Sequence, residues 1–304
     1  MTDQLRFGII TLQSEPWKKM VALWQSIERL DFDSVWVADH FVNYMAPHNP
    51  WFEAWTLLSG LAAVTKRIRI GTLVTANPLR NPVILARQAL TVDHISGGRL
   101  ELGLGAGASG VVDPVYQMTG IDDWAPPERV RRFSEAVQII DQALRNRVTS
   151  YEGRYYKIKE AVIAPAPIQI PRPPITIGAL GPSMLKVTAK YADTWNSFGG
   201  EWGITPEQLL KDTKKRNQLL DKYCKELDRD PHTLRRSFLY FSPYSETVFD
   251  SEENFVNFIQ TYYDIGITEF IFYYPIWYDK DQLHKFEFIG REVIPKLRKN
   301  GIIV

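Results

Sequence analysis

The stretch RIRIGTLVTANPLRNPVILARQALTVDHISGGRLELGLG, residues 67–105, decides the fold. It begins with a β-rich run at 67–74, continues with a helical pattern over 82–96 and returns to a β-rich run at 99–105. Pro82 stands where the first turn of a helix tolerates proline, and Gly97 and Gly98 follow where glycine ends helices. The stretch therefore predicts one strand–helix–strand unit of a parallel α/β protein.

The same alternation extends along the rest of the chain. Further β-rich runs are expected at residues 5–11, 34–38, 175–180, 194–198, 237–241 and 268–273. Helical patterns lie between these runs and after the last one. Eight strands alternating with eight helices predict a (β/α)8 TIM barrel. A doubly wound open sheet is the alternative, and the absence of a GxGxxG motif after the first run counts against it.

Two segments interrupt the alternation and are predicted insertions in a single domain of residues 1–304. Residues 106–126 follow the fourth strand and contain glycine and aspartate, whereas residues 149–174 follow the fourth helix and are rich in proline. Loops that follow strands form the active-site end of a barrel. We therefore expect residues 106–126 to form the active-site loop.

The composition excludes several classes of function. Lysine and arginine total 36 against 35 acidic residues, so a strongly basic nucleic-acid-binding protein is excluded. The single cysteine excludes an intramolecular disulfide, and five histidines without HxH or HExxH spacing predict no metal site. The chain has no membrane-length apolar run and begins without a signal-like segment, so we expect a cytoplasmic protein. Aromatic residues make up 12% and could fill the core or wall a pocket for a flat ligand.

The second predicted strand ends in the pair Asp39-His40. Catalytic groups of barrels sit at such strand ends, and imidazole can move a proton near neutral pH. Adjacent strand residues point to opposite sides, so one of the pair is expected to face the pocket and the other to brace the strand. A purely structural, hydrogen-bonded histidine is the alternative for His40.

Three further strand ends carry groups suited to a ligand. Thr75 and Asn77 offer hydrogen bonds after the third strand, or they belong to a tight turn. The glycines at 103, 105 and 107 allow close approach of a ligand, or they pack inside the barrel. The sequence GALGPS at 178–183 feeds a helix N-terminus and suits a phosphate, with capping alone as the alternative.

Taken together, four motifs resemble the bacterial luciferase-like superfamily of flavin- and F420-dependent oxidoreductases. They are VADHF at 37–41, ARQALTVDHISGGRL at 86–100, GLGAG at 103–107 and GALGP at 178–182. The resemblance covers about residues 5–200 and implies a barrel that binds reduced FMN or coenzyme F420. The cofactor-binding residues that it implies are Leu73, Val74, Thr75, Asn77, Gly105, Gly107, Gly178, Ala179, Leu180, Gly181 and Ser183.

The resemblance also implies roles for individual residues. In relatives that use F420, a histidine matching His40 acts on the substrate hydroxyl, and a non-prolyl cis peptide bond would fall here between Leu73 and Val74. Those relatives carry tryptophan where this chain has Tyr44. They carry acidic residues where it has Gln13 and Ala108, and neither residue can exchange a proton as a carboxylate does.

The leading functional prediction is a reduced-FMN-dependent monooxygenase, supplied with flavin by a separate reductase. Its catalytic residues would be Asp39, His40 and Tyr44, and its substrate pocket would be lined by Gln13, Trp51, Trp195 and Phe198. An F420-dependent reductase or dehydrogenase is the alternative, opposed by the missing carboxylates. A barrel that binds flavin without turnover is a further alternative. Relatives often pair through the helices after strands two and three, so a homodimer is expected.

Overall fold

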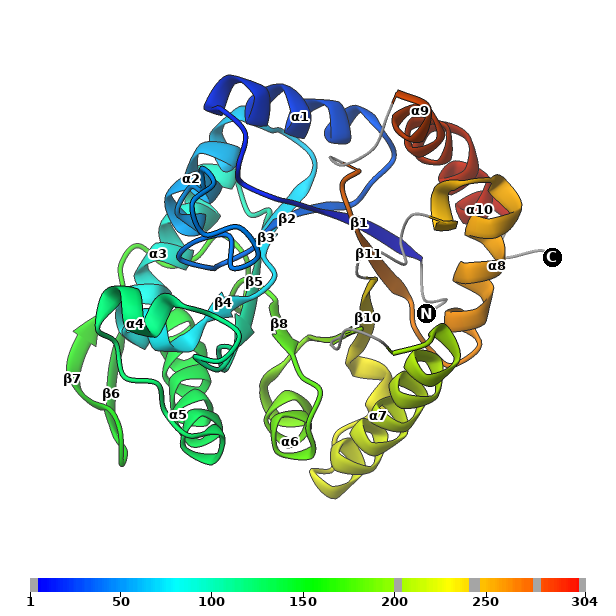
Figure 1. Ribbon diagram of the computed structural model, residues 1–304. Helices are drawn as coiled ribbons and strands as arrows, with labels where there is room; N and C mark the ends of the chain where they lie inside the picture. The colour runs from blue at the N-terminus through cyan, green and yellow to red at the C-terminus, as the bar shows by residue number, and fades with distance from the viewer. Residues whose placement is uncertain (1–4, 200–203, 241–246, 276–279, 301–304) are drawn as a thin grey trace. The chain divides into compact units, whose positions relative to one another are not determined.

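The chain folds as a (β/α)8 barrel, in which strands and helices alternate in the predicted order (Figure 1). The computed structural model describes residues 5–199, 204–240, 247–275 and 280–300. The chain divides into two compact units. The central unit comprises residues 12–21 and 37–178, and the terminal unit comprises the remainder. Helix α1 (Trp17–Arg29) and strand β2 (Ser34–Val37) contain residues of both units.

The central unit contains a parallel sheet built around β5. Strands β3 (Arg69–Thr72), β4 (Thr75–Ala76) and β8 (Ile175–Gly178) all pair with β5 (Leu100–Gly105). The helices of this unit are α2 (Ala54–Val64), α3 (Pro82–Ser96), α4 (Val115–Thr119), α5 (Pro126–Arg145) and the 3-10 turn η1 (Asn77–Leu79).

The decisive sequence stretch folds as predicted, with one correction. Helix α3 begins after Asn81, whose side chain accepts hydrogen bonds from the first turn, and it ends at Gly97 with φ +67°. The run at 67–74 is not one strand, because β3 ends at Thr72 and β4 resumes at Thr75. The pairing with β5 takes up one extra residue between them, so the two residues form a bulge.

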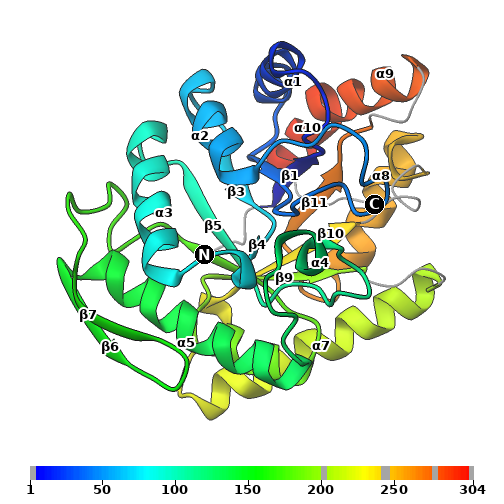
Figure 2. The ribbon, with the colours of Figure 1, turned by 60° about the vertical axis from the view of Figure 1, so that its left-hand side comes forward.

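The two predicted insertions are both structured. Residues 106–126 contain the short helix α4. Residues 149–174 contribute to an antiparallel hairpin of β6 (Val148–Glu152) and β7 (Lys157–Val162), which lies beside α5 in Figure 2. The Glu135 carboxylate of α5 accepts the backbone N–H groups of residues 154–156 at 2.9–3.2 Å. Since one carboxylate satisfies three donors, the hairpin turn is fixed to α5.

The terminal unit contains a second run of parallel strands. Strand β11 (Glu269–Tyr273) pairs with β1 (Arg6–Thr11) and with β10 (Arg235–Tyr240), which pairs in turn with β9 (Thr194–Phe198). Its helical segments are α6 (Pro182–Tyr191), α7 (Pro206–Glu226), η2 (Pro231–Thr233), η3 (Thr247–Phe249), α8 (Glu252–Tyr263), α9 (Lys280–Phe288), η4 (Ile289–Val293) and α10 (Ile294–Asn300).

Aromatic rings fill the core of the terminal unit. Phe7 lies 5.8 Å from Phe255 and 6.0 Å from Phe270, centroid to centroid, and Phe255 lies 5.7 Å from Phe272. Such pairs stabilise a core beyond the area they bury. Part of the aromatic excess is therefore packing. Within the described ranges, no helix is long and apolar enough to cross a membrane.

Candidate active site

The site centres on His40, which follows β2, and on Asp113 of the loop 106–126. His40 Nδ1 lies 2.7 Å from Asp113 Oδ2, and the Val115 N–H at the start of α4 donates to Asp113 Oδ1 at 3.0 Å. An ionised carboxylate only accepts hydrogen bonds, so this contact places the proton of a neutral His40 ring on Nδ1. Nε2 is then the nitrogen that can accept a proton from a reactant.

The surroundings of Asp113 keep its carboxylate charged. Burial by itself opposes ionisation, but the hydrogen bonds from His40 and Val115 N–H and the charge of His40 together hold the pKa of Asp113 below its usual range. His40 and Asp113 therefore form a dyad, in which a carboxylate orients an imidazole.

Asp39 has a different set of partners, although it is adjacent to His40 in the sequence. Arg80 donates to both of its carboxylate oxygens, at 2.9 Å for the Nη2–Oδ1 pair, and the Ala76 N–H donates to Oδ2 at 3.0 Å. Arg80 also donates to Glu53, which caps α2. Asp39 thus braces the end of β2 against η1 and α2, while His40 carries the reactive nitrogen.

Gln13 holds the same strand end through the backbone. Its Nε2 donates to the carbonyl oxygens of Ala38, at 2.5 Å, and Phe52, at 3.2 Å, and its Oε1 accepts from the Ala38 N–H at 3.3 Å. The side chain is completely buried. A carboxylate at this position could not donate to the two carbonyls, which gives a physical reason for glutamine here.

Two aromatic side chains border His40. The Tyr44 ring lies 5.0 Å from the His40 ring, centroid to centroid, and the Trp51 Nε1 donates to the His40 carbonyl oxygen at 2.9 Å. Burial and the charge of Asp113 raise the pKa of Tyr44, so its phenol stays protonated and can donate a hydrogen bond. The structure therefore places both predicted aromatic residues at the dyad.

The bulge between β3 and β4 lies beside the end of β2. The Leu73 N–H donates to the Val37 carbonyl oxygen at 2.9 Å, and the Leu73–Val74 peptide bond is cis. The expected position of a non-prolyl cis bond is confirmed.

The glycines of β5 make room for this bulge. A Cβ atom on Gly103 would lie 1.7 Å from the Thr72 carbonyl oxygen, and one on Gly105 would lie 2.5 Å from Val74 Cγ2. A Cβ atom on Gly178, at the end of β8, would lie 3.4 Å from the Cγ atoms of the same Val74 side chain. The space next to these glycines is filled by the chain itself, as the packing alternative predicts.

The polar side chains that follow the bulge, Thr75 and Asn77, differ in their hydrogen bonding. Thr75 Oγ1 accepts from Trp55 Nε1 at 3.2 Å and lies 2.6 Å from Thr72 Oγ1. Asn77 is buried beside Tyr156, and its Nδ2 has no well-formed hydrogen bond to any residue that the structure describes. The Tyr156 phenol is the hydrogen-bonding neighbour of this buried amide, and the same amide could serve a polar ligand atom. Asn77 therefore fits the cofactor-binding role better than Thr75 does.

The predicted phosphate segment begins α6 in the terminal unit. Gly181 occupies the N-cap position of α6 and no side chain caps the helix, while a Cβ on Gly181 would meet nothing within 4 Å. Leu180 and Ser183 are exposed. Since the first N–H groups of α6 are not capped, the segment fits an anion such as a cofactor phosphate.

Trp195 and Phe198, also in the terminal unit, lie on β9. Trp195 is completely buried, and its Nε1 donates to the Ala179 carbonyl oxygen at 2.9 Å. Trp195 therefore supports the phosphate segment and offers no exposed wall. Phe198, the last residue of β9, is half-buried.

The loop 106–126 is held in place by its own hydrogen bonds. Tyr116 Oη donates to the Ala108 carbonyl oxygen at 2.7 Å, and Asp123 accepts from the Gly110 N–H at 3.0 Å and from Arg129 at 2.7 Å. Gly107 adopts φ +86°, which a side chain would strain. These contacts fix the segment that carries Asp113.

Sequence reasoning missed Asp113. It assigned the loop 106–126 to the active-site end but compared only Ala108 with the acidic position of relatives. The available signal was an aspartate five residues further on, in a loop already assigned to the active-site end. Among the described residues, no group of three histidine, cysteine or acidic side chains could hold a metal ion.

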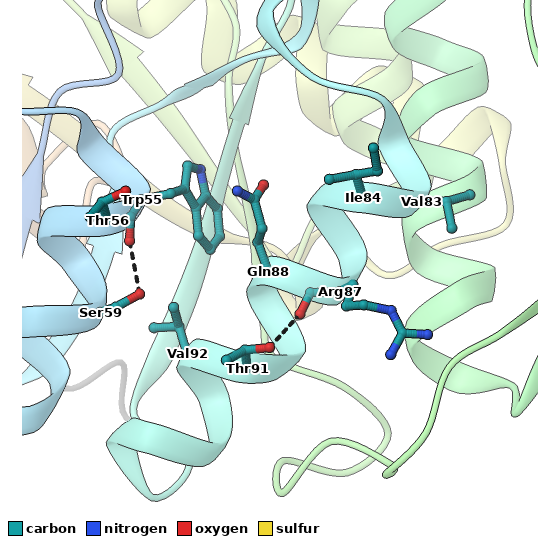
Figure 3. A pocket seen from close by; sticks show the side chains of 9 residues that line it. All are labelled: Trp55, Thr56, Ser59, Val83, Ile84, Arg87, Gln88, Thr91 and Val92. Atoms are coloured by element: carbon teal, nitrogen blue, oxygen red, sulfur yellow. Dashed lines mark hydrogen bonds between the residues drawn. The ribbon is translucent and has the colours of Figure 1, made fainter.

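A separate groove of about 350 Å³ lies between α2 and α3 (Figure 3). Its lining residues are Trp55, Thr56, Ser59, Val83, Ile84, Arg87, Gln88, Thr91 and Val92. Trp55 reaches from this groove to Thr75 through its indole nitrogen. The groove thus belongs to the two helices that were predicted to mediate pairing of two copies.

Comparison with known proteins gives the family. The model of the luciferase-like monooxygenase family matches residues 3–235. The chain belongs to this family. The glucose-6-phosphate dehydrogenase of Microbacterium testaceum, named as F420-dependent, is 32% identical over 66% of this chain and 59% of that protein. The oxygenase component of the flavin-dependent trigonelline monooxygenase of Acinetobacter baylyi is 29% identical over 56% of this chain and 45% of that protein.

This chain also matches solved structures over nearly its whole length. An F420-dependent secondary alcohol dehydrogenase has a TM-score of 0.81 and covers 96% of this chain and 98% of its own, at 18% identity. That likeness supports the barrel fold. These two relatives are oxidoreductases by name, but the matched region spans less than two thirds of the length of each.

Proposed function

We propose that this chain is an oxidoreductase that uses coenzyme F420 to oxidise an alcohol or to reduce the corresponding carbonyl compound. The observation that carries the proposal is the 2.7 Å contact between His40 Nδ1 and Asp113 Oδ2. The main objection from the sequence was the lack of carboxylates at positions 13 and 108. Asp113 supplies a carboxylate to His40 from the expected loop.

The residues of the chain divide the work of such a reaction. His40 Nε2 accepts the hydroxyl proton during oxidation and returns it during reduction, and Asp113 stabilises the protonated ring. The Tyr44 phenol, kept protonated by its raised pKa, offers a second hydrogen bond at the reacting oxygen. The bound deazaflavin would supply the hydride acceptor or donor. Within the central unit, Asn77 Nδ2 is proposed to bind a polar atom of the cofactor. Considered by itself, the N-terminus of α6 in the terminal unit is proposed to bind a phosphate.

A reduced-FMN-dependent monooxygenase is the second candidate. The flavin-dependent relative from Acinetobacter baylyi and the aromatic side chains of Tyr44 and Trp51 beside His40 favour it. This candidate requires a separate flavin reductase as partner. A monooxygenase reaction does not require a protein group that accepts a proton from a substrate hydroxyl. The His40–Asp113 dyad therefore has a less direct role in this candidate function.

Anaerobic titration of the purified protein with F420 and with reduced FMN separates the two candidates. Micromolar binding of F420 with weak binding of FMN is expected. The opposite order would favour the monooxygenase, and binding of neither would contradict both proposals. His40→Ala should retain F420 binding and lose roughly 10²-fold or more in turnover if it exchanges the proton.

We also propose that two copies pair through the groove between α2 and α3. Ile84 lines this groove with 61% of its surface exposed, and covering such a side chain is favourable. Sedimentation should show a dimer for the wild-type chain and a monomer for Ile84→Glu. Ile168→Glu, at an exposed isoleucine outside the groove, should leave the dimer intact. A wild-type monomer at micromolar concentration would contradict the proposal.

A further inference from the structure

Large apolar side chains are exposed on the two segments that the dyad joins. The exposed fractions are 52% for Phe41, 59% for Met45, 96% for Val111 and 54% for Val112. Phe41 follows His40 directly, and Val112 precedes Asp113. The loop after β2, in blue, runs beside the loop that carries α4, in green (Figure 1), and the His40–Asp113 hydrogen bond holds the two together. Exposed apolar side chains on the segments that carry a polar centre are typical of a binding site.

The same two segments carry no permanently cationic side chain that could bind a negatively charged substrate. Residues 39–53 and 105–126 contain neither lysine nor arginine. Two arginines that pair with acidic residues of these segments are already engaged, because Arg80 binds Asp39 and Glu53 and Arg129 binds Asp123. A phosphate or carboxylate placed near His40 would instead meet the charged Asp113 at short range, which is unfavourable.

We infer that the substrate is an uncharged and mainly apolar secondary alcohol or ketone. Its apolar part would lie against Phe41, Met45, Val111 and Val112 while its oxygen meets His40 Nε2. This inference rests on the proposed function. In the oxidation, the C–H bond breaks and its electron pair leaves as hydride to the oxidised deazaflavin. The hydroxyl proton passes to His40, and the C=O double bond forms, so that two electrons and two hydrogens leave the alcohol.

An alkanol series tests the inference by binding and by turnover. Calorimetry with 2-butanol to 2-octanol, on the protein with and without F420, should show affinity rising about two- to fourfold for each added methylene. With F420 bound, kcat/KM should rise in parallel. Glucose 6-phosphate should not bind measurably.

Paired variants locate the apolar contact. The double variant Val111→Ser with Val112→Ser should weaken the increase of alkanol affinity with the length of the alkyl chain. Val148→Ser, at a valine of β6 with 51% of its surface exposed, should leave that dependence unchanged. Affinity that does not rise with chain length, or glucose 6-phosphate binding more tightly than 2-octanol, would overturn the inference. If the alkanols bind in the expected order without hydride transfer to F420, the proposed function fails while the apolar site stands.

Discussion

Asp39, which is next to His40 in the sequence, and Asp113, which contacts it in space, lie in regions that differ in their charged partners. Asp39 sits among Arg80, Glu53 and the Ala76 N–H, so each of its oxygens has a permanent donor. Asp113 accepts hydrogen bonds from one backbone N–H of its own loop and from the imidazole of His40, which follows β2. A carboxylate neutralised by arginine fixes a strand end, whereas one paired with histidine can support proton transfer. The partner, more than the distance from His40, decides the role of each aspartate.

The largest expected effect comes from removing the ion pair between Asp39 and Arg80. Asp39→Asn leaves the Arg80 guanidinium largely buried with only the exposed Glu53 as counterion. Removing one member of a buried pair should lower the free energy of unfolding by about 3–5 kcal/mol, measured by urea denaturation.

Asp31 provides the control for that measurement. It also pairs with an arginine, Arg298, but its side chain is 40% exposed. Asp31→Asn should therefore cost about 1 kcal/mol or less, because solvent screens exposed pairs. Equal losses for the two variants would show that the region around Asp39 is not specially dependent on its charges.

The next effect concerns catalysis rather than stability. Asn at position 113 has one acceptor oxygen, so it cannot serve both the Val115 N–H and His40 Nδ1 as the carboxylate does. Asp113→Asn should lower kcat roughly 10²-fold while F420 binding persists. A variant with unchanged kcat would show that the dyad is structural.

The pH dependence of unfolding provides an independent check on Asp113. Its pKa is lower in the folded chain than the ordinary value of about 3.9, so the charged form stabilises the fold above that pH. That contribution should disappear as the pH falls through the lower folded pKa. Asp113→Asn should show a flatter dependence over this acidic range.

Local sequence patterns predicted the fold. They also predicted that one residue of the Asp39-His40 pair braces the strand, but they did not predict the contact between His40 and Asp113. Pro82 and Gly97 mark the ends of α3, and the strand before Asp39 is legible from its apolar run. The adjacency of Asp39 and His40 indicated that one would brace the strand. The partner of His40 lies 73 residues away, where only the folded loop brings it within reach.

Other features were hidden for the same physical reason. The glycines of β5 suggested room for a ligand, but the room is taken by the bulge at Val74, whose path depends on tertiary structure. Gln13 gave no sign of its function, since all of its partners are backbone atoms of residues 38 and 52. Backbone acceptors have no residue type, so no sequence motif can reveal them.

The smallest expected effect concerns Gln13, which supports the strand end that carries Asp39 and His40. Gln13 anchors Ala38, the residue that precedes Asp39 and His40, by one donated and one accepted hydrogen bond, and it donates a further hydrogen bond to the Phe52 carbonyl oxygen. Gln13→Glu removes the donors and places a carboxylate against carbonyl oxygens, which should lower the free energy of unfolding by about 1–3 kcal/mol.

The pH dependence of this loss gives it a distinct signature. The carboxyl group that Gln13→Glu introduces would be buried next to carbonyl oxygens, which favour its neutral form, so its pKa should be raised in the folded chain. The deficit should therefore be small at acidic pH and grow as the pH rises through that raised pKa. Gln117→Glu, the same change at an exposed position of α4, should cost almost nothing at any pH. If Gln13→Glu lowers kcat by more than Asp113→Asn does, the strand end controls the dyad more strongly than the loop that carries Asp113.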